Sequence, residues 1–252
     1  MSDTPFTPEI LNTLVKRQDI GEDCTLWLLD MTQMPVLMPE DIVEILHESA
    51  VIRYSELSRK QRRVQFVIGR LLTRYAVSTL LNRPMHNFAL IERRSNTPQL
   101  RALPPLTEPL YYSLAYRYDY AACVTSRSHR VGLDIEIADK DREIATPAET
   151  AFNDNENRWL SAKPAENWHE GYHELWTRKE ACFKLLSNKH GGIQDDRFWQ
   201  TDCLNDTRFS WTTQKAEDGL IITICQSDPD VAFELTQTSS YNLDNAFDIF
   251  KR

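Results

Sequence analysis

Two short segments hold the residues most able to do chemistry. In the first, residues 131–137, Asp134 and Glu136 are separated by a single residue. If this stretch is a β-strand, both side chains point to the same face, about 7 Å apart along the strand. Carboxylates placed in this way repel each other unless a cation lies between them, and Mg²⁺ commonly takes one or two carboxylates together with phosphate oxygens. The spacing fits such a cation site, and it also fits two solvated acids on a surface strand.

The second segment, residues 176–184, contains Glu180 and Lys184 four residues apart, with Lys179 beside Glu180. On a helix, Trp176, Glu180 and Lys184 share one face. The same spacing also describes an exposed ion pair worth about 0.3–0.5 kcal/mol, with Trp176 as a core residue.

A long helix is expected from about residue 55 to 81, because apolar residues recur there near the 3.6-residue period. Its polar side is strongly basic, which indicates either an anion-binding surface or a solvated face whose arginine stems cover apolar surface. The basic residues are Arg59, Lys60, Arg62, Arg63, Arg70 and Arg74.

The remaining pattern predicts an α+β fold. We expect further helices at 8–18, 39–49, 147–161 and 166–187, and a turn at Asn96-Thr97-Pro98. Helix followed by strands occurs twice, which favours a pseudo-twofold pair of similar halves, 1–127 and 128–252, each a long helix packed on a small, mostly antiparallel sheet. The expected strands are 24–29, 88–92, 111–115, 120–125, 131–137, 209–213, 220–225 and 232–236.

Composition restricts the class of protein. The 252 residues include 41% hydrophobic and 26% charged residues, which is typical of a globular chain, and the net charge of −8 argues against nucleic-acid binding. No apolar run approaches the roughly 20 residues that span a membrane, and the first nine residues do not resemble a secretory signal. The five cysteines show no paired spacing, so we expect reduced thiols and a cytoplasmic protein.

Taken together, the Gly132–Glu136 stretch and the Trp176–Lys184 stretch resemble the signature of the 4′-phosphopantetheinyl transferases of the surfactin-synthetase type. The resemblance extends over about residues 24–237. Supporting matches are residues 65–72 for the arginine-containing helix of the family, 96–98 for its Gly-Lys-Pro turn, and 151–154 with 159–160 for the segment before its second motif.

The resemblance implies an enzyme that moves the phosphopantetheine arm of coenzyme A onto a serine of an acyl or peptidyl carrier protein and releases 3′,5′-ADP. It implies a monomer that binds no nucleic acid and no membrane. By the match, Asp134, Glu136 and Glu180 would hold Mg²⁺, Glu180 would be the base, and Lys184 would stabilise developing charge. Contacts to coenzyme A would come from Arg63, Arg70, Tyr116, Lys179 and Lys184, with Arg70 at the 3′-phosphate.

Three positions depart from the family pattern. Ala115 and Tyr116 stand where the family has Ser-His, and Thr97 replaces the lysine of Gly-Lys-Pro. Charged phosphate contacts are worth about 1.5–3 kcal/mol each. We therefore expect either an enzyme with an altered nucleotide pocket, in which Arg93, Arg94 or Arg117 substitutes, or a catalytically drifted relative that binds a carrier protein or a synthetase as a subunit. A structural Ca²⁺ site is disfavoured because Asp-x-Glu lacks the loop spacing of an EF-hand.

Overall fold

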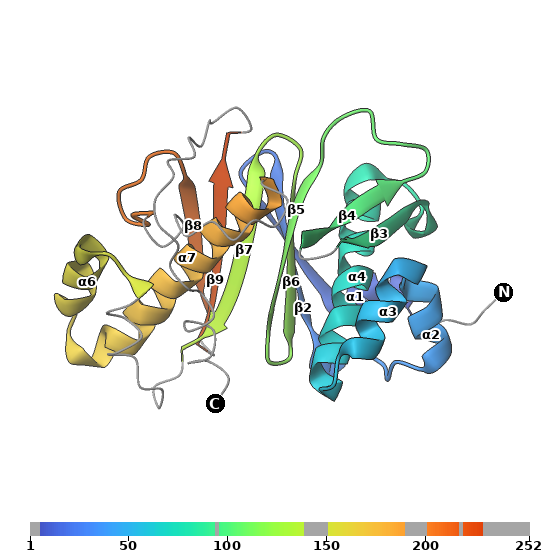
Figure 1. Ribbon diagram of the computed structural model, residues 1–252, viewed down its shortest axis with the longest axis horizontal. Helices are drawn as coiled ribbons and strands as arrows, with labels where there is room; N and C mark the ends of the chain where they lie inside the picture. Colours follow the sequence, from blue (N-terminus) through green and yellow to red (C-terminus); the bar gives the residue numbers. More distant parts are fainter. Residues whose placement is uncertain (1–5, 94–95, 139–150, 190–200, 217–218, 229–252) are drawn as a thin grey trace.

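A computed structural model describes residues 6–93, 96–138, 151–189, 201–216 and 219–228. The described helices and strands follow one another in groups along the chain, in the α+β order expected (Figure 1). They are α1 (Pro8–Leu14), β1 (Val15–Ile20), β2 (Cys24–Asp30), α2 (Pro39–Ile45), α3 (Glu48–Glu56), α4 (Lys60–Leu81), β3 (Phe88–Arg93), β4 (Asn96–Ala102), β5 (Tyr111–Arg117), β6 (Tyr120–Ser126), β7 (Arg130–Ile137), α6 (Asp154–Ser161), α7 (Trp168–Lys189), β8 (Ser210–Lys215) and β9 (Leu220–Ser227).

The described strands form three antiparallel sheets. Their orders are β1-β2-β6-β5, β3-β4 and β7-β9-β8. Strand β5 at the edge of the first sheet lies beside β7 at the edge of the third, where the Ser113 hydroxyl accepts a hydrogen bond of 3.1 Å from the Leu133 amide. This seam joins the early and late parts of the chain.

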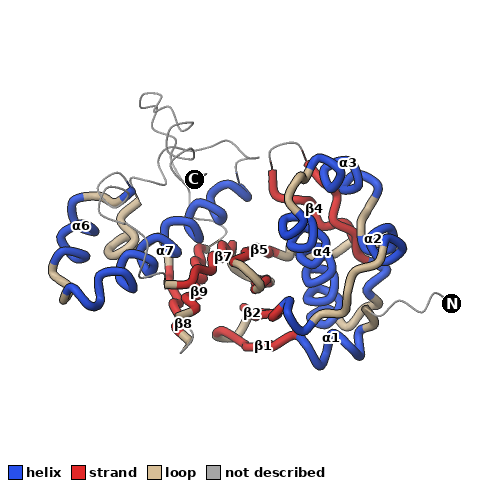
Figure 2. The backbone as a smooth tube through the Cα atoms, turned by 90° about the horizontal axis from the view of Figure 1, so that it is seen from below, coloured by secondary structure: helices blue, strands red, loops and turns tan. Residues whose placement is uncertain are grey.

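The two long helices cover different sheets. Helix α4 packs on β6 and β2 among α1, α2 and α3, while α7 runs along β7 and β9 (Figure 2). Between the sheets, Leu133 and Ile135 of β7 pack with Ala122 and Val124 of β6 in one apolar cluster. Because strand side chains alternate, the opposite face of β7 is turned to α7.

Helix α7 approaches β7 closely because residue 132 is glycine. A Cβ at Gly132 would lie 1.8 Å from the Ala181 carbonyl oxygen, which is inside any allowed contact. Beside this contact, a hydrogen bond of 2.9 Å joins the hydroxyls of Thr177 on α7 and Thr223 on β9. Gly132 thus fixes how near the residues of α7 come to the residues of β7.

Several boundary predictions were wrong. The predicted helix 8–18 ends at Leu14, because residues 15–20 pair with β2 as a strand. The predicted helix 39–49 is interrupted at His47, whose ring accepts a hydrogen bond from the Ser49 amide and caps α3. The predicted long helix 55–81 starts later than expected, because residues 55 and 56 belong to α3. The predicted turn at Asn96-Thr97-Pro98 is the start of β4.

Other predicted elements are found as expected or lie outside the described residues. The strands at 24–29, 88–92, 111–115, 120–125, 131–137 and 220–225 are confirmed within one or two residues, and the strand at 209–213 begins at Ser210. Of the predicted helix 147–161, residues 154–161 are helical and 147–150 lie outside the described part, as does the strand at 232–236. No described helix is both long and apolar enough to cross a bilayer. All five cysteines are free and buried.

Replacing Gly132 by alanine should push α7 away from β7. Because the obstacle is backbone, we expect a loss of about 1–3 kcal/mol in the free energy of unfolding, measured by urea denaturation. The matched control is Gly171→Ala in α7, whose Cβ would meet mainly the flexible end of Lys163. Equal stability of the two variants would contradict the close approach at Gly132.

Candidate active site

Strand β7 presents two carboxylates to α7. Asp134 and Glu136 share the face of Gly132, and each is only 8% exposed. Charged groups at this depth are costly to bury unless they have partners of opposite charge. The partners of both acids therefore decide what this face can do.

Cations from two different elements meet these acids. Lys184 Nζ of α7 lies 2.6 Å from Asp134 Oδ1, and Arg117 Nε of β5 lies 2.8 Å from Glu136 Oε2. Glu180 is one turn before Lys184 on α7. We call Asp134, Glu136, Glu180 and the two cations the acid cluster. It lies where β7, α7 and the end of β5 come together.

The electrostatics show that the three acids act on one another. Burial, together with the charges of Asp134 and Glu136, raises the pKa of Glu180 to about 7, while the charge of Lys184 opposes this shift. Burial also raises the pKa of Asp134 against the lowering effects of Lys184 and Arg117. Glu180 is therefore partly protonated near neutral pH in this arrangement.

The described residues do not contain the compact three-carboxylate group that the sequence predicts around one ion. In that part of the chain, no group of three or more acidic, histidine or cysteine side chains is placed as a metal site would be. The contacts give a physical reason, since Asp134 is turned to Lys184 and Glu136 to Arg117. The donors nevertheless suit a hard cation, because all are carboxylate oxygens and Asp134 Oδ2 is buried without a hydrogen-bond partner in the described residues.

The predicted contacts to coenzyme A on α4 lie in another region. Arg70 is buried and forms an ion pair of 2.5 Å with Glu92 of β3, so its charge is already neutralised. Arg63 Nε donates to the Leu57 carbonyl at 2.5 Å, and its guanidinium lies over the Tyr54 ring. Both cations hold α4 to its neighbours.

Lys179 and Tyr116 also point into the fold. The Lys179 ammonium is fully buried, 2.9 Å from Glu156 Oε2, and donates to the Thr201 carbonyl at 2.6 Å. The Tyr116 hydroxyl is buried against Gly69, and burial raises the pKa of this phenol. These placements favour structural roles over direct contact with a phosphate.

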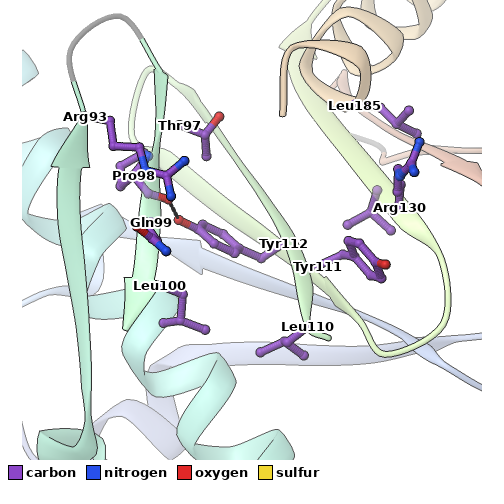
Figure 3. Close-up of a pocket in the computed structure, with 11 residues that line it drawn as sticks. Arg93, Thr97, Pro98, Gln99, Leu100, Leu110, Tyr111, Tyr112, Arg130 and Leu185 are labelled. Atoms are coloured by element: carbon purple, nitrogen blue, oxygen red, sulfur yellow. Dashed lines mark hydrogen bonds between the residues drawn. The ribbon is translucent and has the colours of Figure 1, made fainter. Parts of the chain in front are cut away.

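A pocket of about 310 Å³ lies between the β3–β4 hairpin, the start of β5, and the adjoining parts of β7 and α7 (Figure 3). Leu185 in its wall directly follows Lys184, and Arg130 lies on the same face of β7 as Asp134. Pro98 and Tyr112 are joined by a hydrogen bond from the tyrosine hydroxyl to the proline carbonyl. Two arginines, Arg93 and Arg130, give the pocket an anion-binding character.

Sequence reasoning missed two of these residues. Arg130 could have been found, because it continues the alternation of Gly132, Asp134 and Glu136 by one more step toward the start of the strand. Glu92 could not, because its pairing with Arg70 depends on how β3 packs against α4.

Lys179→Met should strongly destabilise the fold. It leaves the Glu156 carboxylate buried with the Asn153 and Cys203 amides as its donors among the described residues. Breaking a buried pair in this way costs about 3–5 kcal/mol. Urea denaturation measures the loss. The double variant Lys179→Met with Glu156→Gln should recover much of it. A stable Lys179→Met protein that binds coenzyme A less tightly would instead assign Lys179 to the phosphates.

Glu180→Gln should change how stability depends on pH. The folded protein holds the Glu180 proton more tightly than the unfolded chain, so this stabilisation is complete below about pH 4 and is lost as pH rises through about 7. With a chelator present, the free energy of unfolding is measured at pH 5 and at pH 8. Its decrease over this range should be larger for the native sequence than for Glu180→Gln, by on the order of 2–3 kcal/mol. Parallel pH curves for the two proteins would show that Glu180 is not buried among like charges.

Comparison with known proteins supports the motif assignment. Residues 130–236 match the family model of the 4′-phosphopantetheinyl transferase superfamily. Over 153 residues the chain is 28% identical to the protein "4′-phosphopantetheinyl transferase gsp" of Aneurinibacillus migulanus, an alignment that covers 60% of this chain and 59% of that relative. The match includes β7 and α7, and so the strand and helix that carry the three acids. The resemblance predicted from the two motifs is confirmed, because the family model matches the segment that carries both of them.

Proposed function

We propose that the protein transfers the 4′-phosphopantetheine arm of coenzyme A to a serine hydroxyl of an acyl or peptidyl carrier protein. The observation that carries this proposal is the acid cluster, whose three acids and Lys184 lie within the segment that matches the superfamily. A cluster of shielded acids paired with cations is suited to a reaction in which a diphosphate is bound and a proton is moved.

In the proposed reaction, the serine oxygen forms a bond to the β-phosphorus of coenzyme A. The bond from that phosphorus to the bridging oxygen breaks, and 3′,5′-ADP leaves with the electron pair. Glu180 would accept the serine proton. Burial and the neighbouring acids raise the pKa of this carboxyl to about 7, which is close to neutral pH and so suits a general base. Lys184, one turn further along α7, would stabilise the charge that develops on the phosphate oxygens.

A divalent cation, Mg²⁺ in our proposal, would be held by Asp134, Glu136 and Glu180. When bound, it supplies charge neutralisation for the diphosphate. The unpartnered buried oxygen of Asp134 and the mutual repulsion of the acids support this assignment, because an ion would satisfy the first and relieve the second. Lys184 is paired with Asp134 here and would then be able to turn to the substrate.

The nucleotide end of coenzyme A would enter the pocket between the β3–β4 hairpin and β7. Arg93 and Arg130 supply positive charge there, which offsets the uncharged Thr97 and Tyr116. Arg70 could bind the 3′-phosphate only if the phosphate replaced Glu92 as its ion-pair partner. The buried Lys179 would contribute to the site by holding α7 in place.

The proposed architecture is a monomer of two halves, 1–127 and 128–252, related by a pseudo-twofold axis. In support, α4 covers the β1-β2-β6-β5 sheet as α7 covers the β7-β9-β8 sheet. The active site would then lie at the seam of the halves, since Arg117 comes from the first and Glu136 from the second.

One observation favours a second candidate, a drifted relative that binds a carrier protein or synthetase without catalysis. Arg70 is neutralised by Glu92, and both β7 acids are already paired with cations. Calorimetric titration with coenzyme A and Mg²⁺ separates the candidates. Binding of coenzyme A supports the enzyme, and its absence together with retained carrier binding supports the drifted subunit.

The proposed activity predicts labelling of an apo carrier protein by a fluorescent coenzyme A derivative. A panel of carriers should be followed by in-gel fluorescence, with EDTA expected to abolish the signal. Glu180→Gln should lower the rate at least about 100-fold, which is the usual scale for losing a general base.

The matched control is Glu170→Gln, an exposed acid of α7 paired with Lys215. It should label at the rate of the native sequence. Unchanged labelling by Glu180→Gln would refute the assignment of the base, and the failure of every carrier to be labelled would refute the transferase proposal.

A further inference from the structure

Arg117 reaches across the seam between two sheets. It is the last residue of β5, and its Nε lies 2.8 Å from Glu136 Oε2 on β7. The ion pair is largely shielded, with 27% of the arginine side chain and 11% of the glutamate side chain exposed. It is therefore the point at which the β1-β2-β6-β5 sheet contributes a charge to the acid cluster.

The backbone that follows Arg117 is held by hydrogen bonds to other elements. The turn after β5 contains Tyr118 with φ of 47°. The Tyr118 carbonyl accepts from Gln65 Nε2 of α4 at 2.9 Å, and the Asp119 carbonyl accepts from the Met31 amide at 2.7 Å. The Tyr118 ring lies 4.5 Å below the guanidinium carbon. These contacts fix the turn that carries Arg117, and the Tyr118 ring packs against its guanidinium.

The guanidinium has more donors than Glu136 uses. Arginine carries five N–H groups in a planar fork that suits carboxylate and phosphate oxygens. Here Nε faces Glu136, and within the described residues Nη2 makes a long contact of 3.5 Å with the Tyr118 hydroxyl. The side chain is 27% exposed, so the N–H groups that Glu136 does not use can meet a second anion.

A divalent cation and Arg117 cannot share Glu136 Oε2 without strong repulsion, because both are positive and would be separated by a single oxygen. We propose that Arg117 is the resident counter-ion of Glu136, that it competes with a divalent cation for this carboxylate, and that cation binding releases the guanidinium to a phosphate oxygen of coenzyme A. Arg117 is then a positioning residue that couples cation binding to substrate binding. The phosphate contact rests on the function proposed above, and the competition does not.

The first measurement uses Mn²⁺ alone, with free Mn²⁺ counted by electron paramagnetic resonance. Arg117→Gln should bind Mn²⁺ about 3- to 10-fold more tightly than the native sequence, because the competing ion pair is gone. Arg117→Lys keeps the charge and should stay closer to the native affinity. Arg17→Gln is the matched control, since it removes an arginine–carboxylate pair, with Asp19, on β1 and should change nothing.

The second measurement is the affinity for coenzyme A at saturating Mn²⁺, by calorimetry. Arg117→Gln should bind it about 10-fold more weakly than the native sequence, which is the scale of one charge-assisted contact, and Arg117→Lys should restore part of the loss. A purely structural arginine would not give tighter Mn²⁺ and weaker coenzyme A binding in the same variant.

The outcomes separate the two proposals. Equal or weaker Mn²⁺ binding by Arg117→Gln overturns the competition, even if the native protein labels carriers. Tighter Mn²⁺ binding with no labelling of any carrier supports the competition and overturns the transferase function. Tighter Mn²⁺ binding with unchanged affinity for coenzyme A overturns the phosphate contact.

Discussion

The contact between α7 and β7 at Gly132 is the constraint on which the rest of the site depends. Because no side chain separates the Ala181 carbonyl from the strand, Glu180 and Lys184 are brought against Asp134 and Glu136. Three negative charges close together are unfavourable, and they contribute with burial to the raised pKa of Glu180. Arg117 and Lys184 offset part of it. The fold thus places three carboxylates close together and offsets their charge with cations from two different elements.

The acids and their faces were predictable because they follow from local periodicity. Alternation along a strand gives Asp134 and Glu136 one face, and a spacing of four on a helix gives Glu180 and Lys184 another. The strands around β5, β6, β7 and β9 were also predictable, since their apolar residues lie in short runs bounded by turns. Element boundaries were less so, because residues 15–20 become a strand only through pairing with β2.

The partners of the charged residues were not predictable, since each depends on how distant segments pack. Arg70 has the sequence context of a phosphate-binding residue, yet it pairs with Glu92 of another element. Lys179 stands in the motif beside Glu180, but on a helix adjacent residues face about 100° apart. That rotation carries Lys179 into the interior, where it pairs with Glu156. Motif membership therefore identified the helix that carries the site without assigning every residue on it.

We propose above all that Asp134, Glu136 and Glu180 bind one hard cation together. The most direct measurement is a Mn²⁺ titration, by electron paramagnetic resonance, of the native sequence and of the single variants Asp134→Asn, Glu136→Gln and Glu180→Gln. We expect one specific Mn²⁺ per chain and an affinity at least about 10-fold lower in each variant, since each loses one charged ligand. A native protein that binds no Mn²⁺, or one whose affinity any of the three substitutions leaves unchanged, would contradict it.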